Sequence, residues 1–214
     1  MSGPMAATNV RLGVLASGRG SNLQAIIDSI EAGALDARIA VVVSNKKDAQ
    51  ALERARKHHI AELFLDPKPF ASRDDKREAY DRAILEILKK HNVDLVLLAG
   101  YMKIVTPLLI DAYHNRIMNI HPSLLPSFKG LSAQRQAFEY GVKIAGCTVH
   151  FVDASLDGGP IILQSAIAVH DNDDAEILRE RILVEEHRIL ARAADLFARG
   201  RLRIEERRVL GTED

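Results

Sequence analysis

The chain has 214 residues, 47% hydrophobic and 27% charged, a globular mixture that argues against overall disorder, collagen-like repeats or coiled coil. Its 29 basic and 29 acidic side chains cancel, so no global field gathers nucleic acid or an anionic membrane, and a single cysteine, Cys147, excludes an intrachain disulfide. No apolar run approaches the roughly 20 residues of a membrane span, so we expect a soluble cytoplasmic protein. We interpret residues 1–9 as a flexible N-terminus and residues 10–210 as a single domain.

Strands and helices are expected to alternate over the first hundred residues. Short apolar runs rich in β-branched residues predict the strands, and apolar residues at helical spacing predict the helices. The expected strands are 10–17, 37–44, 60–65 and 93–100, and the expected helices are 22–33, 48–58 and 73–90. Two prolines predict a loop at about 66–75. This alternation predicts an α/β fold with a parallel sheet and helices on both faces.

The second half of the chain is less regular. The expected helices are 106–114, 133–141 and 174–198, and the expected strands are 116–122, 147–152 and 160–169, followed by a strand or hairpin within 201–210. The strands at 147–152 and 160–169 are joined by a short turn-forming stretch, which predicts an antiparallel pair.

A glycine-rich turn with the sequence SGRGSN lies at 17–22, between the first strand and the first helix. Its glycines let backbone N–H groups approach a ligand, and the helix that follows has unpaired N–H groups in its first turn, with Ser21 or Asn22 expected as the cap. Such a turn favours a phosphate. A dinucleotide site would need a third glycine where Leu23 stands. A monophosphate site and a plain structural turn are the two main interpretations.

Asn119 and His121 are expected at the end of a strand that Pro122 stops. Residues two apart on a strand share a face, and ligands bind at the carboxyl ends of strands in open α/β sheets. An amide can stabilise an oxyanion and an imidazole can exchange a proton near neutral pH. The alternative is an asparagine in a turn beside a surface histidine.

The sequence LDGGP at 156–160 is a second candidate, because Asp157 can be held at a tight turn where it reaches a histidine. The alternative is a simple β-turn. His150 is interpreted as a structural side chain that could line the site, and the other histidines show no metal-ligand spacing.

Several segments now combine into one pattern: SGRGSNLQAI, SNK near Ser44, LAGYMKI at 98–104, NIHPSLLPSFKG at 119–130 and HFVDASLDGGPIILQ at 150–164. Together they resemble the phosphoribosylglycinamide formyltransferases, the folate-dependent enzymes of purine biosynthesis. The resemblance runs from Val10 to about Arg203. It implies the formyltransferase fold for residues 10–210: a Rossmann-like, mostly parallel sheet with helices on both faces and an antiparallel C-terminal part.

The resemblance also implies a reaction and a set of site residues. The formyl group of 10-formyltetrahydrofolate would pass to the amine of 5-phosphoribosylglycinamide, with no metal required. The catalytic residues would be Asn119, His121 and Asp157. The ribonucleotide-binding residues would be Gly20, Ser21, Asn22 and Glu186. The folate-binding residues would be Arg77, Met102, Lys103, Ile104, Val105, Asn119, Asp153, Ala154, Ser155 and Leu156.

In the expected mechanism the amine attacks the formyl carbon. Asn119 and protonated His121 stabilise the charge on the tetrahedral intermediate, and Asp157 keeps His121 protonated. Two residues depart from the family pattern. Lys103 stands where many relatives carry arginine. Lysine lacks the bidentate fork with which arginine binds a carboxylate tail. Ser132 stands where relatives often have a histidine near the catalytic aspartate, which leaves the partner of Asp157 open.

Other functions fit parts of this pattern. A formyltetrahydrofolate hydrolase uses the same three residues with water in place of the amine, but such relatives usually carry an extra N-terminal regulatory domain. A methionyl-tRNA formyltransferase would need an RNA-binding domain. A non-catalytic nucleotide-binding module would use the glycine turn alone. We expect small-molecule substrates only, and a monomer or homodimer.

Overall fold

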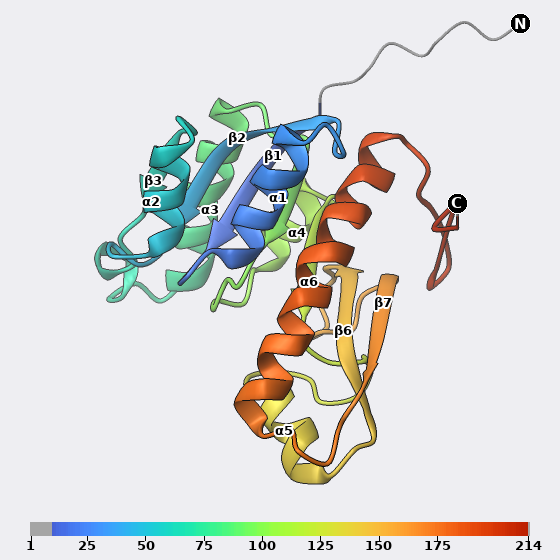
Figure 1. Ribbon diagram of the computed structural model, residues 1–214. Coiled ribbons are helices and arrows are strands. Elements are labelled where there is room, and N and C mark those ends of the chain that lie inside the picture. The colour runs from blue at the N-terminus through green and yellow to red at the C-terminus, as the bar shows by residue number, and fades with distance from the viewer. Residues whose placement is uncertain (1–9, 214) are drawn as a thin grey trace, which may run out of the picture.

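The structure, a computed structural model, describes residues 10–213 (Figure 1). The expectation of a flexible N-terminus at residues 1–9 lies outside the described residues. The strands are β1 (Val10–Ala16), β2 (Ala37–Ser44), β3 (Glu62–Phe64), β4 (Leu95–Leu98), β5 (Ile117–His121), β6 (Ile144–Phe151), β7 (Ile161–Ala168), β8 (Arg203–Glu205) and β9 (Arg208–Leu210). The helices are α1 (Ser21–Glu31), α2 (Gln50–Lys57), α3 (Lys76–Lys90), α4 (Pro107–Ala112), α5 (Ala133–Tyr140) and α6 (Ala175–Ala198), with a 3₁₀ helix, η1 (Lys68–Phe70).

The nine strands of residues 10–213 join one sheet in the order β3-β2-β1-β4-β5-β6-β7-β9-β8. The strands from β3 to β5 run parallel, whereas β5 with β6 and β6 with β7 pair antiparallel. The chain ends in an antiparallel β8–β9 hairpin, and β9 extends the sheet beside β7. The predicted α/β fold, mostly parallel with an antiparallel C-terminal part, is confirmed.

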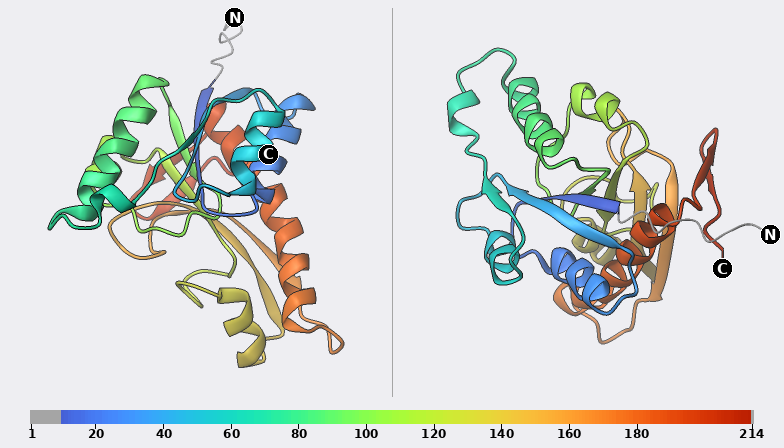
Figure 2. Two further views of the ribbon diagram at one scale, coloured as in Figure 1. Left: turned by 90° about the vertical axis from the view of Figure 1, so that its left-hand side faces the viewer. Right: turned by 90° about the horizontal axis from the view of Figure 1, so that it is seen from above.

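Helices cover both faces of the sheet (Figure 2). The central strand β4 contributes to two cores, because Leu95 and Leu97 pack on one face while Val96 and Leu98 pack on the other. The first core includes apolar residues of α1, α2 and α6, and the second includes those of α3 and α4. Helix α6 also contacts β6, β7 and α5, so it links the parallel and antiparallel parts of the sheet.

The sequence-based bounds differ from the structure in a few places. Residues 68–70, expected to be part of a loop, form η1. Strand β6 begins at Ile144, before the expected start at Cys147. The reason is Gly146, which weakens the strand signal in the sequence although it is required here: a Cβ at this position would lie 1.9 Å from the backbone oxygen of Ser165.

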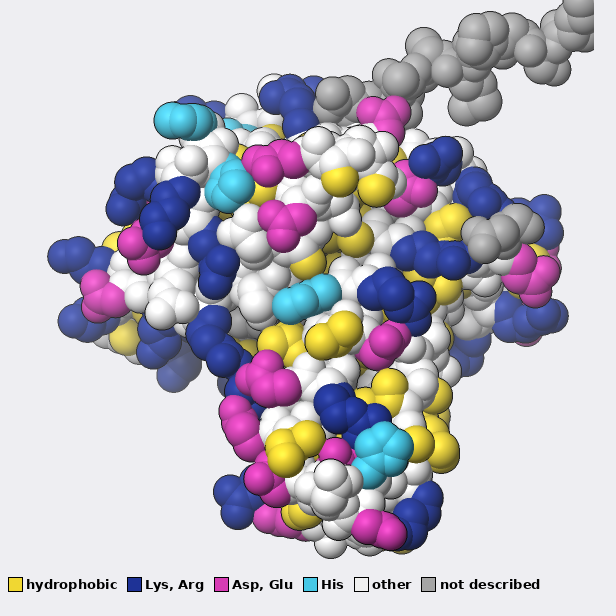
Figure 3. All heavy atoms as spheres, in the orientation of Figure 1, with side chains coloured by type: hydrophobic (Ala, Val, Ile, Leu, Met, Phe, Trp, Pro, Cys, Tyr) yellow, Lys and Arg dark blue, Asp and Glu magenta, His cyan; other side chains and the backbone are white. Residues whose placement is uncertain are grey.

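Three segments meet at one edge of the sheet, because β1, β4 and β5 are parallel neighbours. After β1 comes the glycine-rich turn at 17–22, whose last two residues begin α1; after β4 comes segment 99–106, and His121 ends β5. Ligands in open α/β sheets bind at this edge. Basic and acidic side chains are interspersed over the face shown in Figure 3, in keeping with the zero net charge. No helix within residues 10–213 has the length and apolar character to cross a bilayer.

Candidate active site

Asn119 and His121 lie at the carboxyl end of β5, as predicted. Ile117 packs in the core under α3 and α4, whereas Met118 and Ile120 pack in the opposite core. By alternation, Asn119 and His121 therefore share the face of Ile117. His121 is buried and Asn119 is half-buried.

Asp157 lies in the loop that joins β6 to β7, and its carboxylate oxygen Oδ2 is 3.6 Å from Nδ1 of His121. The Asp157 backbone has a φ of 46°, in the left-handed region that aspartate tolerates better than most residues. Gly159 lets this loop pack closely on β6, since a Cβ there would lie 1.9 Å from the backbone oxygen of Phe151. The turn thus brings together two residues that are far apart in the sequence.

Hydrogen bonds fix the orientation of the His121 and Asp157 side chains. His121 Nε2 is 2.9 Å from the backbone oxygen of Phe128, and because a carbonyl only accepts, Nε2 carries a proton and donates. The backbone N–H of Gly130 donates to Asp157 Oδ2 at 2.8 Å. Gly130 and His121, rather than residue 132, are therefore the partners of Asp157. Ser132 begins the next helix, as the N-cap of α5.

The loop that carries Asp157 is also tied to the C-terminal hairpin. Arg207, between β8 and β9, donates from Nη2 to the backbone oxygen of Gly158 at 2.5 Å. The hairpin is anchored by Ile204 and Val209, and by Leu202 just before it, which pack against the first core. A segment at the end of the described chain therefore contacts the residue that follows Asp157.

His150 contacts Asn119, which the sequence indicated only as a possibility. His150 Nδ1 is 2.9 Å from the backbone oxygen of Phe151, so this nitrogen donates and Nε2 accepts. The Asn119 amide is 3.2 Å from that Nε2 and donates one N–H to it. Burial lowers the pKa of His150, which favours the neutral form that can accept. Within residues 10–213 no second acceptor is paired with the Asn119 amide, so its other N–H can donate to a ligand.

Gly20 shapes the glycine-rich turn. Its φ is 68°, and an added Cβ would lie 2.7 Å from Cα and 2.8 Å from Cβ of Ala51, at the start of α2. Gly20 is also the N-cap of α1, and no side chain of the described residues caps this helix. The expectation that Ser21 or Asn22 would be the cap is therefore wrong: the packing against α2 requires a left-handed glycine at the cap, and the Asn22 side chain is engaged elsewhere.

The Asn22 amide donates to Oε2 of Glu186 in α6 at 2.9 Å, and both side chains are buried. Two of the residues predicted to bind the ribonucleotide are thus in contact although they are far apart in the chain. Burial raises the pKa of Glu186, and the hydrogen bond from Asn22 offsets part of this effect. Oδ1 of Asn22 is buried without a hydrogen-bond partner among the described residues, and such an acceptor is suited to a ligand donor.

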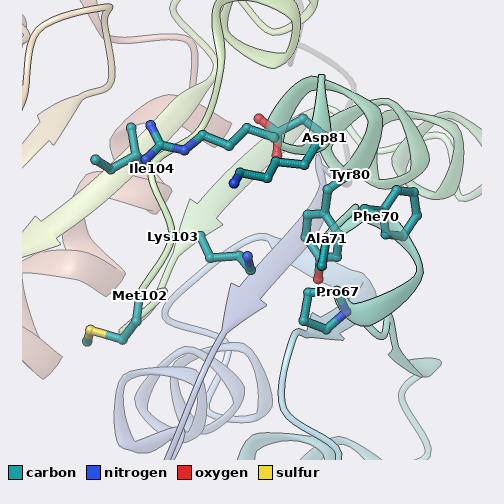
Figure 4. A pocket seen from close by; sticks show the side chains of 10 residues that line it. Pro67, Phe70, Ala71, Tyr80, Asp81, Met102, Lys103 and Ile104 are labelled. Atoms are coloured by element: carbon teal, nitrogen blue, oxygen red, sulfur yellow. The ribbon is translucent and has the colours of Figure 1, made fainter. Parts of the chain in front are cut away.

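A pocket of about 390 Å³ contains four of the residues predicted to bind the folate (Figure 4). Arg77, Met102, Lys103 and Ile104 line it, together with Pro67, Phe70, Ala71, Lys76, Tyr80 and Asp81. Val105 does not line it but packs in the core with α3 and α4. The pocket therefore combines apolar walls with three cationic side chains, which suits an aromatic ligand that ends in a carboxylate.

Besides Asn119 at the end of β5, the remaining predicted folate residues, 153–156, lie beside Asp157 in the β6–β7 loop. Oδ1 of Asp153 accepts from the backbone N–H of Ser155 at 2.9 Å, which folds the loop, and Leu156 is exposed. Among residues 10–213, no group of three or more His, Cys, Asp or Glu side chains is arranged to hold a metal ion.

Comparison with known proteins places this geometry in a family. The formyl transferase family model matches residues 10–194. The phosphoribosylglycinamide formyltransferase of Escherichia coli is 45% identical over 193 residues, which cover 90% of this chain and 89% of that protein. The trifunctional purine biosynthetic protein adenosine-3 of Chironomus tentans is 44% identical over 199 residues, but the chain spans only 14% of its length.

Solved structures agree with the sequence relatives. Glycinamide ribonucleotide transformylase 1 from Symbiobacterium toebii superposes with a TM-score of 0.90 at 56% identity, over 94% of this chain and 92% of that one. A formyltetrahydrofolate deformylase from Pseudomonas syringae superposes with a TM-score of 0.84 at 30% identity, over 95% of this chain and 66% of that one. The chain therefore belongs to the formyl transferase family.

Proposed function

We propose that the chain transfers the formyl group of 10-formyltetrahydrofolate to the amine of 5-phosphoribosylglycinamide, a step of purine biosynthesis. The observation that carries this proposal is the convergence of Asn119, His121 and Asp157 at the sheet edge where the glycine-rich turn also lies. The named relatives and the family match support the same reaction.

The proposed mechanism begins with attack of the ribonucleotide amine on the formyl carbon. A new carbon–nitrogen bond forms, and negative charge develops on the former carbonyl oxygen. The second amide N–H of Asn119 donates to this oxygen. The Nδ1–H of protonated His121 is the other donor, because Nε2 is already bonded to Phe128 and the 3.6 Å separation from Asp157 is longer than a hydrogen bond.

Collapse of the intermediate breaks the bond between the formyl carbon and N10 of the folate. The amine loses one proton and N10 gains one, so the step is balanced without an oxidant or a reductant. Asp157 stabilises the imidazolium and receives a proton from the attacking amine through a water, for delivery to N10. The Asp157 carboxylate is fixed for this role by the Gly130 N–H.

The substrates are assigned to the two sides of this centre. The phosphate binds at Gly20, Ser21 and Asn22, where the first turn of α1 has no side-chain cap. The ribose hydroxyls bind at Glu186. The folate tail lies along the pocket lined by Arg77, Met102, Lys103 and Ile104, and the pterin lies against residues 153–156.

We also propose that residues 10–210 form one domain, because one continuous sheet joins β3 to β8. We also propose a cytoplasmic location, because the proposed substrates are small water-soluble molecules. The assembly, monomer or homodimer, stays a prediction.

Hydrolysis of 10-formyltetrahydrofolate is the second candidate, since the deformylase structure shares the fold. Both reactions release tetrahydrofolate, so the test compares its release with and without 5-phosphoribosylglycinamide. We expect release only when the ribonucleotide is present, with one formylated ribonucleotide formed for each folate. Release at the same rate without the ribonucleotide would replace transfer by hydrolysis, and no release in either case would favour a nucleotide-binding module.

A further inference from the structure

Asp81 of α3 is a buried carboxylate that the proposed mechanism does not use. Its side chain lines the tail pocket (Figure 4), and the residue is only 3% exposed. Burial raises its pKa, while the hydrogen bond from Thr106 and the charge of Lys103 favour the ionised form. Burial of a carboxylate costs free energy unless hydrogen bonds or a nearby cation compensate for the lost water. The contacts of Asp81 therefore indicate its role.

Asp81 holds one end of segment 102–106. The backbone N–H of Thr106 donates to Asp81 Oδ2 at 2.5 Å. The other end is held by Ser17, whose hydroxyl accepts from the backbone N–H of Met102 at 2.8 Å. The Thr106 side chain makes no capping hydrogen bond to α4, so the contact with Asp81 sets where this segment meets the helix.

Between these two ties the segment presents its side chains in alternation. Met102 and Ile104 are 64% and 61% exposed, whereas Val105 is 7% exposed and packs in the core. The ammonium of Lys103 lies 4.8 Å from the ring centroid of Tyr80, the neighbour of Asp81 in α3. Exposed large apolar side chains on a segment fixed at both ends are typical of a preformed binding surface.

We propose that Asp81 is a positioning residue that fixes segment 102–106 in the conformation that binds the folate donor. The proposal rests on the proposed function, because that function assigns the segment to the folate. Asp81 acts through the Thr106 N–H and does not touch the reacting atoms. Removal of the Asp81 carboxylate should weaken binding of the folate donor. It should leave the glycine-rich turn in place, and with it binding of the ribonucleotide.

The test compares Asp81→Ala and Asp81→Asn with the control Glu78→Ala. Glu78 lies about one turn earlier on α3, pairs with Arg82 at 2.9 Å and does not line the pocket. Binding of 10-formyltetrahydrofolate to the full chain is measured by isothermal titration calorimetry without the ribonucleotide. KM for each substrate and kcat follow from the transfer assay, and circular dichroism melting identifies a variant that fails to fold.

We expect Asp81→Ala to weaken donor binding by about tenfold or more, as for loss of a hydrogen bond to a charged group. KM for the ribonucleotide and kcat should stay within about threefold of the wild type. Asp81→Asn keeps an oxygen that can accept from the Thr106 N–H, so its affinity for the folate donor should lie between those of the wild type and Asp81→Ala. This variant provides the test if Asp81→Ala fails to fold. Glu78→Ala should match the wild type.

The proposal is overturned if both KM values rise equally or if kcat alone falls. It is also overturned if Asp81→Asn and Asp81→Ala both bind the donor with wild-type affinity. Failure of the proposed function is distinguishable from failure of the proposal about Asp81. If the wild type binds the donor but transfers nothing to the ribonucleotide, the reaction assignment is wrong, while calorimetry still tests Asp81. If the wild type transfers normally and the Asp81 variants bind the donor normally, only the role of Asp81 is wrong.

Discussion

Replacing Gly20 by alanine should lower the stability of the fold and weaken substrate binding. The structure provides control variants that separate these two effects. A left-handed backbone costs a non-glycine residue about 1–2 kcal/mol. The added Cβ would also lie 2.7 Å from Cα of Ala51, and overpacking of this kind costs about 1–3 kcal/mol. We therefore expect Gly20→Ala to lower the free energy of unfolding by about 2–5 kcal/mol.

Two other glycines serve as controls for this prediction. Gly33, just after α1, has a φ of 71° and nothing within 4 Å of an added Cβ, so Gly33→Ala should cost only the backbone term of about 1–2 kcal/mol. Gly18 has open space and no left-handed φ, so Gly18→Ala should leave stability nearly unchanged. Urea unfolding measures all three, and thermal midpoints should fall by roughly 2–4 °C per kcal/mol.

Steady-state kinetics then test the phosphate assignment. Displacement of the turn in Gly20→Ala should raise KM for the ribonucleotide more than KM for the folate, whereas Gly33→Ala should change neither. The reasoning is refuted if Gly20→Ala destabilises the chain no more than Gly33→Ala. The phosphate assignment is refuted if Gly20→Ala raises both KM values equally.

Three further predictions address charged groups. His121→Ala and Asp157→Asn should each lower kcat by about 10²–10³ while circular dichroism stays unchanged, and near-normal turnover of either would remove it from the mechanism. Burial raises the folded-state pKa of Glu186 above its ordinary value of 4.5, so the folded chain holds that proton more tightly and stability falls as pH rises above 4.5. Glu186→Gln removes this loss, so urea unfolding should show a gain relative to wild type that grows as the pH rises above 4.5 and levels off above the folded-state pKa; a difference that is the same at every pH contradicts this. Lys103→Arg restores a bidentate donor and should lower KM for the folate, and an unchanged KM would place the carboxylate tail elsewhere.

The sequence predicted most of the fold because its signals are local. The alternation at 10–100 sets strands and helices, and the polar pair at 119 and 121 follows from strand periodicity. Contacts between distant segments left no such signal. Nothing near Asp81 indicates that it bonds to Thr106, and nothing near His150 shows that it accepts from Asn119. The predicted cap of α1 was wrong for the same reason, because position 20 requires glycine only through its close contact with Ala51 of α2.

The hairpin contact made by Arg207 has a consequence for the order in which the chain becomes functional. Synthesis proceeds from the N-terminus, and early parts of a chain fold before late ones. Asp157 is followed by two adjacent glycines, the residue type with the widest backbone freedom, and one of the contacts of Gly158 comes from a side chain 49 positions downstream. A nascent polypeptide therefore acquires the glycine-rich turn and the Gly130 contact of Asp157 before the last tie on this loop, the Arg207 contact, can form.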